Sequence, residues 1–438
     1  METSSSMRIR LTPIKLALVV ILLICLVWVA GQVISGGLLS LMPPRVDTRW
    51  SMPIKMENVN SLFRWNGMAV GRGVGGVFHF LNDDGQWIEK HVPGFEIEKN
   101  ESFYPVAMDV HGPTAIFFDV KYSNKVEAIP SFINTTMDPG QNVKVGPGIP
   151  LRNSVQDLFG EAPTNSGFRR EVALRCGQGA VCESGLYIPY IASSTEIIEI
   201  ITSAGTHQQK QRSGSDVCGV FYSADAGRSW QCARVGTFTE SYSATIHATS
   251  RHLYLLRIER ARNLWFSTLS SSPSTWSEPK LLIDTIDQGR YLAEAGNDTL
   301  HLCWMDMRLK RGLGFFLYGD WDVGRANNQV FYRNYRDADS KWGKERKLSG
   351  SLSHCESPSM SVEDQRIVIA WHNIETLYTR AAIYYATSKD NGRTWSRPTK
   401  IKDSENSAGA YPCPKVILHR GVIHMFYNGM YQHREFPN

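Results

Sequence analysis

The stretch Ser-Lys-Asp-Asn-Gly-Arg-Thr-Trp occupies residues 388–395 and decides the fold of this chain. A run rich in aromatic and small apolar residues, Arg380 to Ala386, comes just before it. Asp, Asn and Gly tolerate a left-handed backbone, and Asp and Asn side chains bond nearby backbone groups, so the stretch predicts a hairpin turn. The same pattern returns at residues 223–230 as Ser-Ala-Asp-Ala-Gly-Arg-Ser-Trp. A repeated hairpin of this kind indicates an all-β chain built from repeats.

The shared pattern, Ser-x-Asp-x-Gly-x-Ser/Thr-Trp, resembles the Asp-box of sialidases and other β-propellers. In that family the box is a rim turn that locks the outer hairpin of a blade and lies away from the active site. The resemblance therefore implies structural roles for Ser223, Asp225, Gly227, Trp230, Ser388, Asp390, Gly392 and Trp395.

The expected number of blades is counted from degenerate copies of the box. They lie at Leu81–Trp87, Ser270–Trp276 and Arg336–Trp342, while Tyr104–Ile149 has the alternation of strands without a box. The segment Tyr411–Tyr431 also has strand pattern and no box, so we expect it to share one blade with the first segment of the chain. Such a closure leaves no free sheet edge. This count predicts a six-bladed β-propeller over residues 58–431, and a seven-bladed ring is the alternative.

An apolar run precedes the propeller. Leu16 to Ile34 is long enough to cross the hydrocarbon core as a helix, and Arg8, Arg10 and Lys15 come before it. The positive charge predicts a cytosolic N-terminus and an extracytoplasmic propeller, on a periplasmic, lumenal or cell-surface side. A cleaved signal peptide is the alternative. The expected division is a cytosolic segment at 1–15, a transmembrane signal anchor at 16–36, a stalk at 37–57, the propeller at 58–431 and a tail at 432–438.

Composition narrows the function classes. The net charge of +5 is spread over the chain, which argues against a nucleic-acid surface. The 12 histidines form no His-Glu-x-x-His pattern and no Cys-x-x-Cys pair occurs, so we expect neither a metal nor another cofactor. Two cysteine pairs, Cys176 with Cys182 and Cys218 with Cys232, are spaced to close short loops in an oxidising compartment. The long insertion between Ser193 and Ser215 is polar and is expected to be mobile.

The resemblance to sialidases also implies a set of site residues. In that family three arginines bind the substrate carboxylate, because a planar guanidinium holds a carboxylate through two parallel bonds. A tyrosine attacks under the influence of a glutamate, an exception to the scheme with two carboxylates. Tyr411 matches the nucleophile and Glu240 the residue that activates it. The three arginines correspond to Arg64, Arg257 and Arg308.

Each of these assignments has a structural alternative. Tyr411 is followed by Pro412 and also suits a packed inner strand, and Arg257 begins a charged run that suits a solvated turn. Asp306 and Arg308 suit a structural pair. One departure from the family is larger, because no carboxylate lies between Arg64 and Phe78, where the family places its acid/base aspartate.

Two functions are consistent with these features. The first is a membrane-anchored sialidase-like glycoside hydrolase, retaining and with a tyrosine nucleophile, that acts on sialylated or other acidic glycans. The second is a non-catalytic propeller that binds a glycan or a partner protein. The hydrolase requires Tyr411, Glu240 and the arginines to meet at one end of the ring.

Overall fold

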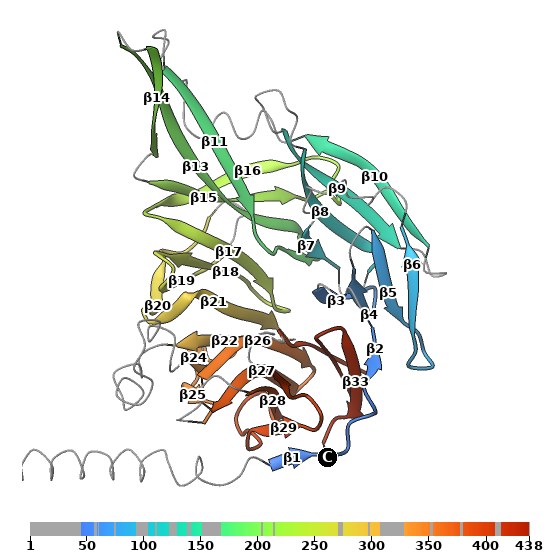
Figure 1. Cartoon of the computed structure of the whole chain (residues 1–438). Coiled ribbons are helices and arrows are strands. Elements are labelled where there is room, and N and C mark those ends of the chain that lie inside the picture. The colour runs from blue at the N-terminus through green and yellow to red at the C-terminus, as the bar shows by residue number, and fades with distance from the viewer. Residues whose placement is uncertain are drawn as a thin grey trace, which may run out of the picture.

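The computed structural model is a chain of β-strands arranged as seven sheets. The described residues are 45–56, 59, 61–73, 76–92, 104–109, 112–121, 129–137, 142–150, 168–202, 205–212, 215–269, 275–296, 298–306, 328–350, 354–376, 380–407 and 413–437. Neighbouring strands pair antiparallel within the sheets, except for one parallel pair at the edge of one sheet, and the sheets follow one another around a ring (Figure 1).

The first four sheets are here called blades 1 to 4, and blades 1, 2 and 4 are four-stranded meanders. Blade 1 contains β3 (Ser61–Trp65), β4 (Met68–Arg72), β5 (Val77–Leu81) and β6 (Trp87–His91). Blade 2 contains β7 (Tyr104–Met108), β8 (Thr114–Lys121), β9 (Ile129–Met137) and β10 (Val143–Pro150). Blade 3 contains β11 (Phe168–Cys176), β12 (Ala180–Cys182), β13 (Gly185–Thr202), β14 (Gly205–Arg212), β15 (Asp216–Ser223) and β16 (Gln231–Phe238). Blade 4 contains β17 (Ser241–Ala248), β18 (Leu253–Glu259), β19 (Asn263–Thr268) and β20 (Lys280–Ile283).

The last three blades complete the ring and take two strands from the N-terminal side. Blade 5 contains β21 (Ile286–Ala295), β22 (Thr299–Asp306), β23 (Gln329–Arg336), β24 (Lys341–Trp342) and β25 (Arg346–Lys347). Blade 6 contains β26 (His354–Glu363), β27 (Arg366–Thr376), β28 (Arg380–Ser388), β29 (Thr399–Ile401) and β30 (Asn406–Ser407), with β1 (Arg45–Asp47) parallel to β29. Blade 7 contains β31 (Lys415–His419), β32 (Val422–Tyr427) and β33 (Met430–Glu435), with β2 (Ile54–Lys55) as its outermost strand.

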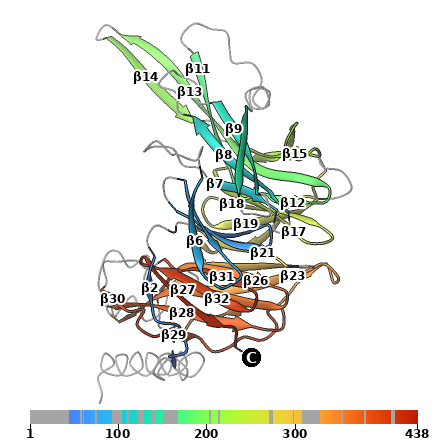
Figure 2. The ribbon, with the colours of Figure 1, turned by 90° about the vertical axis from the view of Figure 1, so that its right-hand side faces the viewer.

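Hydrophobic clusters join each blade to the next. Because side chains alternate between the two faces of a strand, each sheet contributes one face to the cluster before it and one to the cluster after it. Clusters link blades 1 to 7 in sequence, and a further cluster links blade 7 back to blade 1. The first strands of neighbouring blades also contact one another, as β17 does with β21 and β21 with β26. The chain is therefore a closed β-propeller (Figures 1 and 2).

The ring has seven blades, so the expected count of six is wrong. The C-terminal strands do share a blade with the N-terminal side, but that side supplies β2 alone. Blade 1 is a separate sheet whose first hairpin turns at Asn66 and Gly67, with φ of 49° and 70°. Asn-Gly is the strongest short hairpin signal in a sequence, and the glycine-rich residues after it obscured the strands on either side.

The two box stretches form turns with the same hydrogen bonds. In blade 3, Ser229 donates its backbone N–H and hydroxyl to Asp225 at 2.8 and 2.6 Å, which with Ser223 lowers the pKa of Asp225 to about 2. In blade 6, Thr394 donates in the same way to Asp390 at 2.8 and 2.5 Å. These turns connect β15 with β16 in blade 3 and β28 with β29 in blade 6.

The other residues of the two turns also occupy matching positions. The backbone N–H groups of Gly227 and Gly392 donate to the hydroxyls of Ser223 and Ser388. Trp230 packs against the cluster between blades 2 and 3, and Trp395 against the cluster between blades 5 and 6. Each turn therefore has a structural role, because it places a tryptophan against the hydrophobic cluster between two blades.

Two further expectations differ from the structure. The insertion between Ser193 and Ser215 is an antiparallel ribbon of β13 and β14, which with β11 projects from the ring (Figure 2). Ladder hydrogen bonds order its polar sequence, which composition alone does not reveal. Cys176, Cys182, Cys218 and Cys232 form no disulfide, and Phe221 rather than Cys218 lies opposite Cys232.

The predicted transmembrane segment, residues 16–36, lies outside the described residues. Within the part of the chain that the structure describes, no helix is long and apolar enough to cross a bilayer.

Candidate functional site

The residues predicted from the sialidase resemblance do not all lie together. Arg64 is in β3 beside the turn to β4, and its Nη2 donates to the backbone oxygen of Leu418 in blade 7. It lines a central cavity of about 1010 Å³ formed by turns between the first and second strands of the blades, including Gly67, Asp109 and Ala248. Glu294 of blade 5 lies near Arg64; burial raises the pKa of Glu294 to about 7, against the opposing charge of Arg64.

Glu240 and Arg257 lie toward the other end of blade 4. Ser241 pairs with Glu259 at one end of the β17–β18 hairpin, and Ala248 pairs with Leu253 at the end that lines the central cavity. Glu240 precedes this hairpin, so it is about 25 Å from Ala248 along the strand at the ~3.3 Å rise per residue. The structure therefore does not bring Glu240 together with Arg64.

Arg257 is buried, with 3% of its surface exposed. Its guanidinium carbon lies 3.3 Å from the ring centre of Phe238 and 5.6 Å from that of Trp265. Nη1 is 3.8 Å from a Glu259 carboxylate oxygen, and burial lowers the pKa of Arg257. The residue therefore packs between blades as a cation on aromatic rings and is closed to a ligand. Tyr411 and Arg308 lie outside the described residues.

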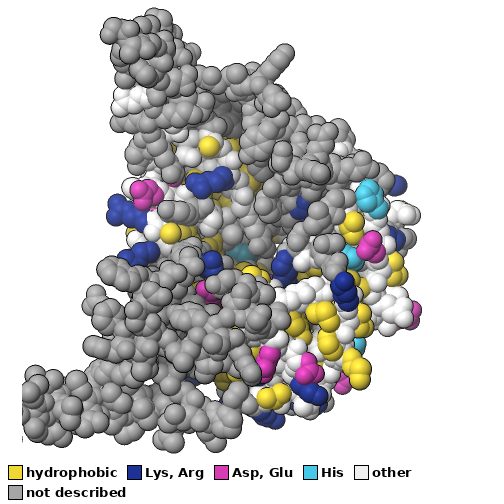
Figure 3. All heavy atoms as spheres, in the orientation of Figure 1, with side chains coloured by type: hydrophobic (Ala, Val, Ile, Leu, Met, Phe, Trp, Pro, Cys, Tyr) yellow, Lys and Arg dark blue, Asp and Glu magenta, His cyan; other side chains and the backbone are white. Residues whose placement is uncertain are grey.

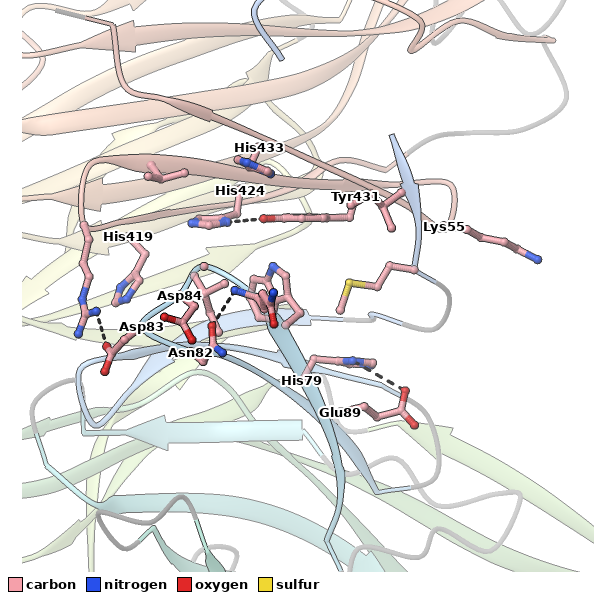
Figure 4. A pocket seen from close by; sticks show the side chains of 18 residues that line it. Lys55, His79, Asn82, Asp83, Asp84, Glu89, His419, His424, Tyr431 and His433 are labelled. Carbon is pink, nitrogen blue, oxygen red and sulfur yellow. Dashed lines mark hydrogen bonds and ion pairs between the residues drawn. The ribbon is translucent and has the colours of Figure 1, made fainter. Parts of the chain in front are cut away.

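A different cleft brings histidines, carboxylates and aromatic rings together among the described residues. It has a volume of about 830 Å³ and lies between blade 1 and blade 7, where the ring closes (Figure 4). We call it the seam cleft. Its lining includes His79, Asn82, Asp83, Asp84, Gln86, Trp87 and Glu89 from blade 1, with His419, Arg420, His424, Tyr431 and His433 from blade 7.

The cleft exists because this interface has the smallest hydrophobic cluster of the ring. Among the described residues, Ala69, Leu81 and Ile417 are its three buried members, whereas eight or more form each of the other interfaces. The alternation of β5 explains the difference. Phe78 and Phe80 point into the cluster shared with blade 2, and the opposite face of the strand turns His79 toward blade 7.

Blade 7 contributes an aromatic wall. His424 Nδ1 and the Tyr431 hydroxyl are hydrogen-bonded at 2.8 Å, and the two rings lie side by side and nearly coplanar, with an interplanar angle of 10°. The ring of His433 stacks on Tyr431 at 5.7 Å between centroids. Trp87 meets Tyr431 edge-on from the blade 1 side, with 6.1 Å between the ring centroids. The wall of His424, Tyr431 and His433 is therefore a set of flat aromatic rings with polar edges.

The hairpin between β5 and β6 supplies polar groups opposite this wall. Asn82 Oδ1 accepts from the backbone N–H of Gln86 at 2.7 Å, which fixes the turn. Asp83 forms an ion pair with Arg420 of blade 7 and so ties the rim across the seam. His79 is 4% exposed, and its Nε2 has no hydrogen-bond partner among the described residues. A buried polar atom of this kind calls for a water or a ligand group.

Three histidines of the seam cleft, His79, His419 and His424, have lowered pKa values and are neutral near pH 7. Burial, with the neighbouring His433 and His419, lowers the pKa of His424 to about 3. Burial also lowers the pKa of His79, against the opposing effect of Glu89. The pKa of His419 is lowered by burial and by the charges of Arg420 and Arg64. A neutral imidazole offers one donor and one acceptor, which matches hydroxyl groups.

The sequence reasoning missed the seam cleft. Its nearest signal was the pair of strands Val-Phe-His-Phe-Leu at 77–81 and Val-Ile-His-Met-Phe-Tyr at 422–427, each with a histidine inside an apolar run. Taken alone, each of those sequences is typical of an ordinary core strand. No group of three or more His, Cys, Asp or Glu side chains in the described part of the chain is placed to hold one metal ion.

Comparison with known proteins gives structural similarity alone. No family model and no curated protein matches the sequence. The structure is similar to that of Trypanosoma rangeli sialidase, with a TM-score of 0.45 and 10% identity over 79% of this chain and 54% of that one. Phage phi92 endosialidase gives a TM-score of 0.41 with 8% identity, covering 89% and 70%. A mutant of Synechocystis apocarotenoid oxygenase gives 0.43 with 11% identity, covering 78% and 71%.

The chain spans about half the length of the Trypanosoma rangeli sialidase chain. Because one fold hosts unrelated activities, function has to be argued from the site.

Proposed function

We propose that this chain is a membrane-anchored extracytoplasmic β-propeller that binds a glycan in the seam cleft without cleaving it. The observation that carries the proposal is an aromatic wall that faces hydrogen-bonding side chains across one cleft. The wall consists of His424, Tyr431 and His433, and the polar side carries Asn82 and Asp84. A sugar ring has an apolar face of C–H groups and an edge of hydroxyls, so it fits both sides at once.

The charge of the cleft favours an uncharged sugar over an acidic one. Its lining carries three carboxylates, Asp83, Asp84 and Glu89, and two cations, Lys55 and Arg420. Arg420 is already paired with Asp83, and the buried histidines are neutral. A sialic acid would therefore meet carboxylates without a free guanidinium to receive its own carboxylate. The ligand class is a hydroxyl-rich neutral glycan.

The hydrolase remains the competing function. It needs Tyr411 beside Glu240 and three arginines around one carboxylate. Arg64 lines the central cavity, and Arg257 is buried against Phe238. These positions support binding over catalysis. The proposed anchor rests on the apolar run at 16–36, and the orientation rests on the basic residues before it.

The first experiment measures glycan binding by the full-length chain in nanodiscs, on an array of neutral and sialylated oligosaccharides. We expect binding to neutral glycans. Trp87→Leu and Asp84→Ala should each weaken that binding at least tenfold. The matched controls are Trp342→Leu, which removes an aromatic ring between blades 4 and 5, and Asp298→Ala, an exposed aspartate of blade 5. Equal losses in the control variants would show that the site lies elsewhere.

The second experiment separates binding from catalysis. The full-length chain is incubated with a fluorogenic sialoside, and Tyr411→Phe serves as the control for the predicted nucleophile. We expect no turnover above the background of the variant. Turnover that disappears in Tyr411→Phe would replace the binding proposal with the hydrolase.

A further inference from the structure

The segment from Arg45 to Lys55 runs along the outer edges of blades 6 and 7. It pairs with β29 through β1 and with β33 through β2 (Figure 1). Five large hydrophobic side chains are exposed among the described residues, and three of them belong to this segment. They are Val46 at 47% exposure, Met52 at 87% and Ile54 at 56%. Single exposed apolar residues are ordinary, whereas three within one short segment require a reason.

The segment is held firmly, so its exposed residues are not those of a frayed end. Trp50 is buried and meets the ring of Tyr385 edge-on at 5.4 Å. Asp47 is buried in an ion pair with Arg434 of blade 7. The backbone N–H of Ser51 donates to His433 at 2.9 Å. The inward side chains fix the segment, and the apolar outward ones are held at the surface.

The charge of the exposed side chains has one sign. Arg45, Arg49 and Lys55 are exposed, whereas the segment's one carboxylate, Asp47, is buried and is paired both with Arg434 and, at 3.1 Å, with Arg49 Nε. Apolar residues beside basic ones suit the boundary between lipid tails and anionic headgroups. In the space-filling view, the neighbouring surface over β2 and β33 carries hydrophobic and charged side chains of both signs (Figure 3). Acidic side chains of neighbouring strands therefore lie around the segment, which itself has no exposed carboxylate.

We propose that the exposed side chains of Arg45, Val46, Arg49, Met52, Ile54 and Lys55, here called the lipid strip, contact the bilayer that holds the chain. This inference rests on the proposed anchor at 16–36. The eight residues 37–44 then separate the anchor from Arg45. Even fully extended they span at most about 28 Å, at ~3.5 Å per residue. The chain length therefore keeps the strip near the membrane surface.

Contact with lipid accounts for both features of the strip. Transfer of the Val46, Met52 and Ile54 side chains from water to the acyl boundary lowers the free energy. The three basic residues gain from the negative surface potential of anionic lipids, which weakens within a Debye length. The strip also borders the seam cleft, because Ile54 and Lys55 line its rim. The proposed glycan site would then open beside the membrane.

The test uses the full-length chain in nanodiscs of phosphatidylcholine and phosphatidylserine. A photoreactive p-benzoylphenylalanine replaces Met52 in one variant and Leu281 in the control. Leu281 is 50% exposed on β20 of blade 4, beside the exposed Lys280. We expect lipid adducts at position 52 with at least tenfold higher yield than at position 281. Equal yields would overturn the lipid strip.

Charge is tested in the same system. Arg45→Gln combined with Lys55→Gln should reduce the adduct yield at position 52 at least threefold in nanodiscs with phosphatidylserine. The control Lys280→Gln should leave the yield unchanged. An adduct yield that depends neither on lipid charge nor on the Arg45 and Lys55 substitutions would contradict the proposed contact of the basic residues with anionic lipid.

Extraction with alkaline carbonate separates the anchor from the strip. A chain that resists extraction but gives no adducts at position 52 disproves the strip and leaves the anchor in place. A chain that carbonate removes disproves the anchor, and the strip with it. Glycan binding is measured separately, so neither outcome bears on the seam cleft.

Discussion

Asp47 and Arg434 form a buried ion pair that joins the N-terminal strand to the last strand of the ring. Asp47 is 4% exposed and Arg434 is 5% exposed. The hydroxyl of Tyr385 lies within the same group, donating to Asp47 and accepting from Arg434. The pair thus holds blades 6 and 7 together where β1 lies beside β33, the last strand of the ring.

Asp47→Asn should lower the free energy of unfolding by about 3 kcal/mol, because it leaves the charge of Arg434 buried without a counter-charge. The control is Asp339→Asn, which removes an ion pair with Arg336 whose side chains are nearly half exposed. That change should cost less than about 1 kcal/mol. Urea unfolding of both variants measures the difference. Similar costs for the two would mean that Asp47 does not brace the ring.

Gly392 should tolerate alanine far less well than Gly67. Both have positive φ, at 81° and 70°, so alanine strains either backbone by about 1 kcal/mol. At Gly67 an added methyl group meets nothing within 4 Å, whereas at Gly392 it would lie 1.9 Å from the hydroxyl oxygen of Tyr332. That hydroxyl is held by His301 at 2.7 Å. Thermal unfolding should therefore show a larger loss in Gly392→Ala, and equal losses would disprove the clash.

The sequence was most informative where structure is local. The hairpins at 223–230 and 388–395 could be predicted because their hydrogen bonds join residues within one turn. Blade 1 was missed as a separate sheet, although Asn66-Gly67 marked its first hairpin. Counting boxes failed there because a blade needs strands and a hydrophobic face, and blade 2 has no box at all.

The candidate site was harder to predict because distant strands build it. His79 and His424 lie far apart in the sequence and meet only when blade 7 closes on blade 1. Each is a polar residue inside an apolar strand, and alternation alone does not say which neighbour its face will meet. Arg257 shows the reverse case, since a charged run suggested a solvated turn and the guanidinium is buried on Phe238. Tertiary contacts decided both.

Asp390 should support stability above pH 4 and lose that support on acidification. Burial alone would raise its pKa, but hydrogen bonds from Thr394 and Ser388 outweigh it, so the pKa lies below the ordinary value. The unfolded chain then takes up a proton near pH 4 that the folded chain takes up only at lower pH. Comparison of melting temperatures should show Asp390→Asn well below the parent chain at pH 6. The gap should narrow between pH 4 and pH 2, and a constant gap would contradict the prediction.

His424 should make the seam between blades 7 and 1 sensitive to mild acid. Its pKa is lowered to about 3 by burial and by His433 and His419, against an ordinary value near 6.5. Between these values the unfolded chain binds a proton that the folded chain excludes, so stability falls as the pH falls below 6.5. By pH 5 this one group should have removed about 2 kcal/mol, at ~1.36 kcal/mol for each pH unit.

His424→Gln removes this proton while keeping an amide that can bond Tyr431, so its stability should decline less between pH 6.5 and pH 5. The exposed His252→Gln is the control and should follow the parent chain. His247 and His301 are also buried with lowered pKa values, so the variant should flatten the decline without abolishing it. Urea midpoints at closely spaced pH values measure the slope. Parallel curves for the parent chain and His424→Gln would mean that the imidazole is already protonated in the folded ring, or that acid opens the seam before unfolding.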